Sequence, residues 1–345
     1  MLRTTSGGTQ WKDVTPVGSS RQRIDVHYFY AFNSHIAWVA GTSRGATAQI
    51  FRTVDGGRTW KAITNPGVKS ISFITSRDGW FLVSLGAATG SEGVDIYRST
   101  DGGEIWGKVA SAMPGSPDSG LPFGGNKSSI TFLNPTTGWI TGVVVTPDWV
   151  YLYVTRDGGR TWRRQNLPLP SQPQQDQPLP PQVIPHWDAW PWPPKFFTPR
   201  DGIMRVDYHH FLFDNATGDT RDGQLSVFYI THDSGTTWTY TTPVSIRHPE
   251  PRRQPSSFAD MNHGWVKEGG VLHMTSDGGR RWTTIRPGPL FADVIQLNFV
   301  SPKVGWAVRN TDPYSGGSKQ ISPFLLKTVD GGRTWSPVTY TILRQ

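Results

Sequence analysis

The sequence predicts an all-β protein, a β-propeller of four-stranded antiparallel blades, from three observations. One eight-residue motif recurs along the whole chain of 345 residues, a second motif precedes most of its copies, and no long helical periodicity separates them. Repeats spaced about 50 residues apart, with one turn signal in each, are typical of propellers and related arrays. The 38 glycines and 28 prolines also fit a chain with many turns.

The first repeated element, which we call the turn motif, reads Thr-x-Asp-Gly-Gly-x-Thr-Trp. Six copies keep the aspartate, and in a seventh, decayed copy Ser6 replaces it. The seven copies are Thr4–Trp11, Thr53–Trp60, Ser99–Trp106, Thr155–Trp162, Thr231–Trp238, Thr275–Trp282 and Thr328–Trp335. The aspartate position therefore falls at 6, 55, 101, 157, 233, 277 and 330, at intervals of 44 to 76 residues.

Each turn motif predicts a hairpin. An aspartate carboxylate can accept hydrogen bonds from its own downstream backbone N–H groups, and glycine adopts positive φ without steric cost. The closing tryptophan is expected in the seam between neighbouring sheets, where a large aromatic side chain buries the most area. We therefore interpret the motif aspartates as structural groups: Asp55, Asp101, Asp157, Asp233, Asp277 and Asp330.

A second element, an apolar strand followed by a short polar turn and Gly-Trp, comes before most turn motifs. It is clearest at Ile71–Phe81, Ile130–Ile140, Phe258–Val266 and Leu297–Val308. Two strands around Gly-Trp and two around the turn motif make the four antiparallel strands of one blade.

This pattern gives six complete units and an N-terminal half unit in residues 1–17. Seven blades are favoured, and a six-bladed ring with an extra hairpin is the alternative. Val338–Leu343 offers no inner strand pair for the half unit. We expect such a pair, and a leader, to lie outside the sequence given.

Composition excludes several function classes. The chain has no cysteine, which rules out disulfides, thiol catalysis and cysteine-based metal sites. No apolar run reaches the roughly 18 residues that a membrane-spanning helix needs. The net charge of +8 is spread over many turns, and its densest cluster, residues 247–253, is short and contains an acid, so no nucleic-acid partner is predicted. Because the repeats run from end to end, we expect one domain over residues 1–345.

Long insertions are all predicted at one end of the blades, opposite the turn motifs. We call this end, where strand two joins strand three and strand four leaves the blade, the rim. The insertions are Ser84–Val94, Gly107–Ser128, Arg163–Pro194, Asp207–Gln224, Tyr240–Ser256 and Asn310–Ser322. Loops positioned by a rigid scaffold commonly carry function. The rim is therefore the predicted working face.

The longest insertion, a Pro/Trp-rich loop at residues 163–194, holds three of the four tryptophans outside the repeats. These tryptophans either fold back to plug the propeller mouth, contact another subunit, or form a platform for a sugar ring or a peptide. The 207–224 insertion adds histidines and acids without EF-hand spacing, so no metal is predicted. The candidate ligand-binding residues are Trp187, Trp190, Trp192, His209, Arg252 and Arg253.

The turn motif resembles the Asp-box, or BNR repeat, of bacterial sialidases and several propeller families. The longer stretch at residues 305–335, Gly-Trp-Ala-Val before Leu-Lys-Thr-x-Asp-Gly-Gly-x-Thr-Trp, most resembles photosystem II assembly/stability factors. This resemblance implies a propeller whose boxes are structural and which acts by binding or assembling a partner. The photosynthetic role is not carried over, because that family's compact blades lack these insertions.

Catalysis is not predicted, although a sialidase-like glycoside hydrolase is the alternative. Only the first two residues of the sialidase Arg-Ile-Pro signature are present, at residues 23–25. Asp25 replaces the proline, so a negative charge lies next to the arginine that would bind the substrate carboxylate. The carboxylates that would serve an enzyme are Glu250, Asp188 and Asp312. We expect instead a secreted, periplasmic or surface-anchored binding scaffold without a cofactor. A protein or peptide is the predicted partner and a glycan the second choice; a structural module of a larger surface protein is a third interpretation.

Overall fold

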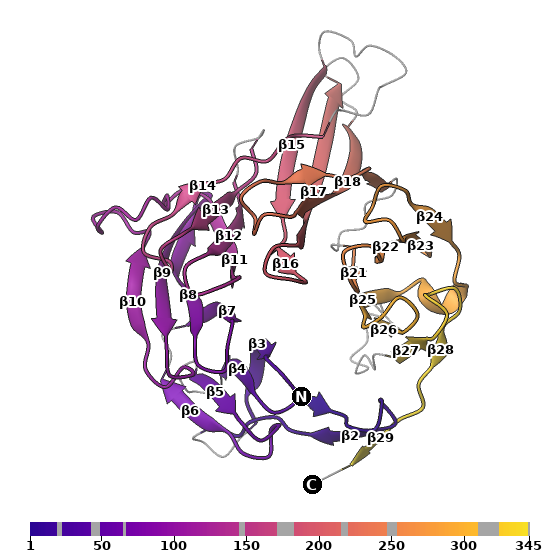
Figure 1. The fold of residues 1–345 in the computed structure, drawn as a ribbon, viewed down its shortest axis with the longest axis horizontal. Coiled ribbons are helices and arrows are strands. Elements are labelled where there is room, and N and C mark those ends of the chain that lie inside the picture. The colour runs from indigo at the N-terminus through magenta and orange to yellow at the C-terminus, as the bar shows by residue number, and fades with distance from the viewer. Residues whose placement is uncertain are drawn as a thin grey trace. The chain divides into compact units, whose positions relative to one another are not determined.

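The structure is a computed structural model that describes residues 1–18, 23–42, 49–64, 67–144, 149–170, 183–214, 220–246, 254–309 and 324–343. It confirms the predicted fold class: the described strands form seven sheets, the blades of an all-β propeller (Figure 1). Within this part of the chain the helical structure is a single 3₁₀ turn, Pro289–Phe291. No helix found there is long and apolar enough to cross a membrane.

Tertiary contacts divide the chain into two compact units. The first unit contains Met1–Leu167, Asp188–Pro194 and Thr341–Gln345, and the second contains Pro168–Trp187 and Lys195–Tyr340. Each unit is described here by itself.

The first unit holds the N-terminal sheet and three complete four-stranded sheets, in which consecutive strands pair antiparallel. The N-terminal sheet contains β1 (Leu2–Arg3), β2 (Gln10–Asp13) and β29 (Thr341–Leu343). The complete sheets are β3 (Asp25–Ala31), β4 (Ala37–Thr42), β5 (Gln49–Thr53) and β6 (Lys61–Thr64); β7 (Val68–Phe73), β8 (Gly79–Ala88), β9 (Ser91–Ser99) and β10 (Gly107–Ser111); and β11 (Asn126–Phe132), β12 (Gly138–Val143), β13 (Leu152–Thr155) and β14 (Arg163–Arg164).

The later part of the chain forms a six-stranded sheet and two four-stranded sheets. The six-stranded sheet contains β15 (Val183–Pro191), β16 (Lys195–Phe196), β17 (Gly202–Asp214), β18 (Thr220–Thr231), β19 (Thr239–Tyr240) and β20 (Val244–Ile246). The others are β21 (Ser256–Phe258), β22 (Gly264–Glu268), β23 (Val271–Thr275) and β24 (Thr283–Ile285), and β25 (Val294–Phe299), β26 (Gly305–Arg309), β27 (Phe324–Thr328) and β28 (Ser336–Pro337).

The N-terminal sheet differs from the predicted antiparallel pattern. The chain's C-terminal strand β29 lies parallel to β2, with Gln10 opposite Thr341, on the side of β2 away from β1. Val338–Leu343 thus contributes an outer strand, and no inner pair is present among the described residues of this sheet. The parallel direction arises because β29 enters the sheet from a separate pass of the chain rather than through a hairpin.

Two insertions prove to be extensions of strands. Residues 84–94 lengthen β8 and β9, and residues 207–214 and 220–224 lengthen β17 and β18. The Pro/Trp-rich loop contains strands at both of its described ends, β14 and β15, and β15 lies next to β17 in its sheet (Figure 1). Apolar and aromatic residues such as Val183, Ile184 and Trp187 favour a strand here, since an edge-strand position tolerates the prolines.

The core of each unit follows the seams between consecutive blades. Trp38 is fully buried, its ring stacks on that of Phe73 at 3.6 Å between centroids, and its indole N–H donates to the Gly102 carbonyl at 3.0 Å. Phe73 in turn lies on Gly79, where a Cβ atom would collide with the phenyl ring. The Gly-Trp element is therefore a packing unit, since the glycine makes room for the next aromatic ring.

The turn motifs have nearly the same hydrogen bonds in each copy that keeps the aspartate. In the first of these, Thr53 Oγ1 accepts from the Gly57 N–H at 2.8 Å and donates to the Asp55 carboxylate at 2.8 Å. The carboxylate also accepts from the Thr59 N–H at 2.9 Å and from the Thr59 hydroxyl at 2.7 Å. Gly56 and Gly57 have positive φ angles of 75° and 84°, which explains the paired glycines.

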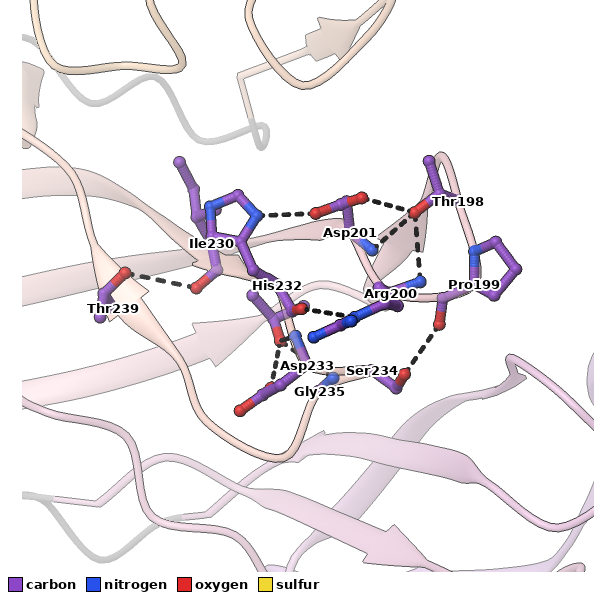
Figure 2. A network of polar contacts seen from close by, with 11 residues as sticks. Thr198, Pro199, Arg200, Asp201, Ile230, His232, Asp233, Ser234, Gly235 and Thr239 are labelled. Carbon is purple, nitrogen blue, oxygen red and sulfur yellow. Dashed lines mark hydrogen bonds and ion pairs between the residues drawn. The ribbon is translucent and has the colours of Figure 1, made fainter.

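In at least two blades a second turn holds the turn motif in place from the side. In the six-stranded sheet, Arg200 Nε donates to the His232 carbonyl at 3.2 Å, Ser234 donates to the Pro199 carbonyl at 2.9 Å, and His232 Nδ1 lies 2.7 Å from Asp201 (Figure 2). An earlier blade repeats the first of these contacts, because Arg77 Nε donates to the Thr100 carbonyl at 3.2 Å. This recurrence marks the network as scaffold.

Acid should weaken the turn motifs. Burial alone would raise the pKa of Asp330, but hydrogen bonds from Thr334 and Thr328 outweigh it and lower that pKa to about 2. The pKa of Asp233 is lowered to about 2 by the equivalent bonds from Thr237 and Thr231 against the effect of burial. An unfolded aspartate titrates near pH ~3.9. The stability that these bonds supply is therefore present above about pH 4 and lost as the pH falls through about 2.

We accordingly expect the urea midpoint to fall between pH 5 and pH 2, and to fall less in an Asp233→Asn/Asp330→Asn variant. Urea denaturation followed by tryptophan fluorescence at each pH measures this. A variant whose midpoint drops as far with acid as that of the wild type would contradict the assignment.

Candidate binding rim

Two predicted insertions of the first unit lie side by side at the rim of the blade formed by β7 to β10. The tip of the β8–β9 hairpin meets the segment between β10 and β11, where Ser91 and Gly125 form a parallel bridge. The Glu92 N–H donates to the Phe123 carbonyl at 3.0 Å, and the Gly125 N–H donates to the Gly90 carbonyl at 2.9 Å. The sequence predicted that both insertions lie at the rim, but it did not predict that they contact each other.

A buried carboxylate lies beneath this junction. Glu92 is 2% exposed and accepts hydrogen bonds from Lys69 Nζ at 2.7 Å, from Ser84 Oγ at 2.6 Å and from the Lys127 backbone N–H at 2.7 Å. Lys69 supplies a compensating positive charge, since its ammonium group contacts both carboxylate oxygens. A buried carboxylate with a cation and two further donors is well satisfied in its charged form.

A fully buried ammonium group closes the junction from the other side. Lys127 Nζ donates to the carbonyls of Glu92 and Phe123, both at 2.8 Å, and to those of Gly125 at 3.0 Å and Gly124 at 3.2 Å. Burial lowers the pKa of Lys127 to about 8, against the opposing effect of the Glu92 carboxylate. We call Lys69, Ser84, Glu92 and Lys127 the Glu92–Lys127 cluster. It fixes the two insertions together with charge-assisted hydrogen bonds.

Three large apolar side chains are exposed around this cluster, and we call them the rim platform: Leu85, Met113 and Phe123. They are 46%, 38% and 40% exposed. Leu85 is the bulged residue between Ser84 and Gly86, and Met113 lies so close over Gly93 that a Cβ atom there would collide with its sulfur. Each platform residue is thus placed by the backbone that the Glu92–Lys127 cluster holds.

An indole also lies near this end of the next blade. Trp149 is half-buried, packs against Tyr151 at 5.6 Å between ring centroids, and has the Arg164 guanidinium 4.4 Å from its ring centre. Tyr151 lies beneath Lys127, whose ammonium group is 5.7 Å from the tyrosine ring centre. Neither Trp149 nor the platform was among the predicted ligand-binding residues. The available signal was that Trp149 is a tryptophan outside the repeats.

The second unit joins two other insertions through a similar buried group. Arg205 Nε donates to the Asp207 carboxylate at 2.7 Å, and both side chains are at most 4% exposed. Ser226 Oγ donates to the same carboxylate oxygen at 2.7 Å, while Arg205 Nη1 donates to the Gln254 carbonyl at 2.7 Å. These bonds connect the 207–224 insertion with the end of the 240–256 insertion.

The predicted residue His209 lies beside this second cluster. It follows Asp207 by two positions on β17, so both side chains lie on one face of the strand, and His209 is half-buried. Arg252 and Arg253 directly precede Gln254, but they lie outside the described residues. The structure therefore puts one of these three candidates at the rim of the six-stranded sheet and leaves the two arginines as predictions.

The tryptophan candidates lie on a strand rather than on a free loop. Trp190 belongs to β15 and Trp192 follows it directly, and both are half-buried, as is Asp188. The side chain of Trp187 is outside the described part of the structure. The catalytic candidates Glu250 and Asp312 also fall outside it, so their distances from Asp188 stay undetermined. Among described residues, no group of three or more His, Asp or Glu side chains could hold a metal ion.

These features define a class of protein, a seven-bladed β-propeller with elaborated rims. No protein-family model matches the sequence, and no curated protein matches it. Solved structures that resemble it include a GH74 xyloglucanase from Xanthomonas campestris, at 13% identity and a TM-score of 0.31. The match covers 88% of this chain but only 59% of the xyloglucanase.

Two further similar structures are carbohydrate-active enzymes. A Hadza microbial sialidase shows 16% identity and a TM-score of 0.45, over 88% of this chain and 66% of the sialidase. The α-L-arabinofuranosidase Arb93A from Fusarium graminearum shows 13% identity and a TM-score of 0.45, over 87% of this chain and 92% of that enzyme. Such likenesses concern the fold alone. The resemblance to photosystem II factors stays a prediction.

Proposed function

We propose that this chain is a non-catalytic, extracytoplasmic binding propeller that holds a protein or peptide segment on its rim. The rim platform carries the proposal, because Leu85, Met113 and Phe123 are exposed apolar side chains on a base that the Glu92–Lys127 cluster fixes. A preorganised apolar surface loses little conformational entropy when it binds. Methionine and phenylalanine are also enriched at protein interfaces, where flexible methionine adapts to varied partners.

The carboxylates of the two rim clusters support a role in structure rather than in acid–base chemistry. Glu92 accepts bonds from Lys69, Ser84 and Lys127, and Asp207 accepts bonds from Arg205 and Ser226. A glycoside hydrolase instead needs two carboxylates about 5–10 Å apart that face the sugar. The resemblance of the turn motifs to the Asp-box and to assembly factors agrees with binding as the activity.

A glycan-processing role is the second candidate, favoured by one feature of β15. Asp188 and Trp190 are two residues apart on this strand, so they lie on one face, and both are half-buried. A carboxylate beside an indole can serve a sugar, since the indole offers a flat apolar face and an N–H donor. In this role Asp188 would be the acid.

Panning a random peptide display library on the wild-type protein tests the first proposal. We expect enriched peptides to lose at least about tenfold in affinity for a Met113→Ser/Phe123→Ser variant, since two buried apolar contacts contribute on that order. Ile105→Ser is the matched control, because Ile105 is 74% exposed at the turn-motif end of the same blade. The platform would be refuted if the enriched peptides bound the double variant as tightly as the wild type, or if Ile105→Ser lowered their affinity by the same factor.

A fluorogenic glycoside panel that includes a sialoside tests the second candidate. We expect no turnover by the wild-type protein. Turnover that disappears in Asp188→Asn would establish a hydrolase and overturn the non-catalytic proposal. Retained turnover in that variant would remove Asp188 as the acid.

A further inference from the structure

The insertion that carries Phe123 also contacts the next blade, formed by β11 to β14. The Trp162 backbone N–H donates to the Ser119 carbonyl at 2.7 Å. Further along the insertion, Gly125 lies so close to Tyr151 that a Cβ atom there would collide with the tyrosine ring. Phe123 lies between these two contacts in the chain, so the surface of the rim platform continues onto the next blade.

Beside both contacts the next blade presents an arginine stacked on a tryptophan. Arg164 follows Trp162 by two positions, and Trp149 precedes Tyr151 by two. The Arg164 guanidinium group lies 4.4 Å from the Trp149 ring centre, and Tyr153 is the residue opposite Arg164 in the sheet. We call Trp149, Tyr153 and Arg164 the cationic corner.

The guanidinium group of this corner has no acidic partner in the described part of the chain. Arg164 is exposed, and no described carboxylate pairs with it. Asp118, the one acid of the 107–128 insertion, accepts the Gly120 N–H at 2.7 Å within its own turn. Stacking on an indole restrains a guanidinium group, so its donor groups lose less conformational freedom when they bind an anion. The corner is therefore preorganised for an anion.

The neighbouring cations indicate which anion fits. Lys69 is bound to the Glu92 carboxylate, Lys127 is bound to backbone carbonyls, and Lys108 pairs with Asp95 at 3.3 Å. A phosphate group carries a charge of about −1.5 to −2 at pH 7 and would require more than one available cation. A single guanidinium group matches a single carboxylate, which it can bind through two parallel hydrogen bonds.

We propose that the segment held on the rim platform carries an aspartate or glutamate that pairs with Arg164, beside apolar side chains that contact Met113 and Phe123. This inference rests on the proposed function, since it concerns the partner of the same surface. The apolar contacts supply most of the affinity, whereas the ion pair sets the orientation and selects against basic segments. The partner is thus an acidic, amphipathic peptide segment.

Selections from a random peptide display library on the wild-type protein and, in parallel, on Arg164→Gln test this inference. We expect peptides selected on the wild type to combine apolar residues with an aspartate or glutamate. Those selected on Arg164→Gln should keep the apolar residues without the acid. Arg163→Gln is the matched control, because Arg163 is also exposed on β14 but points to the opposite face of the strand.

Synthetic copies of the enriched peptides measure the ion pair directly. Their C-termini are amidated, so that the carboxylate under test belongs to a side chain and not to a chain end. Replacing the acid by its amide should weaken binding to the wild type by about threefold to tenfold. The loss should shrink between about 50 mM and about 500 mM NaCl, because salt screens an exposed ion pair. The same replacement should not change binding to Arg164→Gln, and thermal unfolding checks that each variant is folded.

The possible failures of this inference and of the proposed function are distinguishable. Peptides that depend on Met113 and Phe123 but carry no acid, or that bind Arg164→Gln as tightly as the wild type, would overturn the cationic corner and leave the binding propeller in place. An equal loss of affinity in Arg163→Gln would also overturn it, since the attraction would then be general. If no peptide is enriched, or if Met113→Ser/Phe123→Ser binds the enriched peptides unchanged, the proposed function fails and this inference fails with it.

Discussion

Replacing Glu92 by glutamine is expected to lower the free energy of unfolding by about 3–5 kcal/mol, the usual cost of removing one partner of a buried ion pair. The carboxylate is 2% exposed and contacts the Lys69 ammonium group at 2.7 Å. Its loss leaves the buried Lys127 ammonium group without the nearby negative charge that favours its protonation. Chemical denaturation followed by circular dichroism measures the change.

Glu104→Gln is the matched control for this prediction. Glu104 has a side chain that is 46% exposed and pairs with Lys61 at 3.2 Å, so solvent screens the interaction. An exposed pair contributes about 0–1 kcal/mol, and a change of that size is expected. A Glu92→Gln variant that is no less stable than Glu104→Gln would show that the Glu92–Lys127 cluster does not hold the rim insertions in place.

Coupling between the two members of the cluster can be measured by a double-mutant cycle. Lys127→Met alone leaves the Glu92 carboxylate with Lys69, while it removes four hydrogen bonds to carbonyl groups. The loss of unfolding free energy in the double variant Glu92→Gln/Lys127→Met should be smaller than the sum of the losses in the two single variants. The reason is that the double variant has neither the Glu92 carboxylate nor the Lys127 ammonium group, so neither group is left without the other. Strict additivity would mean that the two groups act independently.

The sequence predicted the blades because their signals are local. The turn motif encodes its own hydrogen bonds, since Thr53, Asp55 and Thr59 lie within one turn. The Gly-Trp element is likewise a local signal, and the structure shows its tryptophans Trp80 and Trp265 to be buried. Repetition then supplies the number of blades.

The rim was predicted only as a location, because its contacts depend on distant residues and exact register. Glu92 and Lys127 are 35 residues apart, and Arg205 contacts a carbonyl 49 residues away. Nothing in the local sequence shows that β15 lies beside β17, or that β29 lies parallel to β2. The rarity of glutamate was the one usable signal for this cluster, since Glu92 is one of only four glutamates in the chain.

Replacing Trp80 by alanine is expected to cost about 3–5 kcal/mol of unfolding free energy, the usual range for a large buried aromatic side chain. Trp80 is fully buried, stacks on Phe132 at 3.7 Å between ring centroids, and donates to the Gly158 carbonyl at 2.9 Å. Trp80→Phe keeps a ring but loses the hydrogen bond, so it should cost less. Trp306→Ala is the matched control, because Trp306 occupies the Gly-Trp position of another blade but is half-buried.

The Trp80→Ala variant should also open a cavity within a complete blade, because it leaves Arg98 facing Gly158 without an indole. An apolar cavity left by a deleted side chain can bind a small aromatic molecule of matching shape. Free indole should therefore raise the thermal midpoint of Trp80→Ala in a concentration-dependent way, since a ligand that binds only the folded state stabilises it. Trp306→Ala should show no such rise. If indole leaves the midpoint of Trp80→Ala unchanged, the surrounding side chains close the space when the tryptophan is removed.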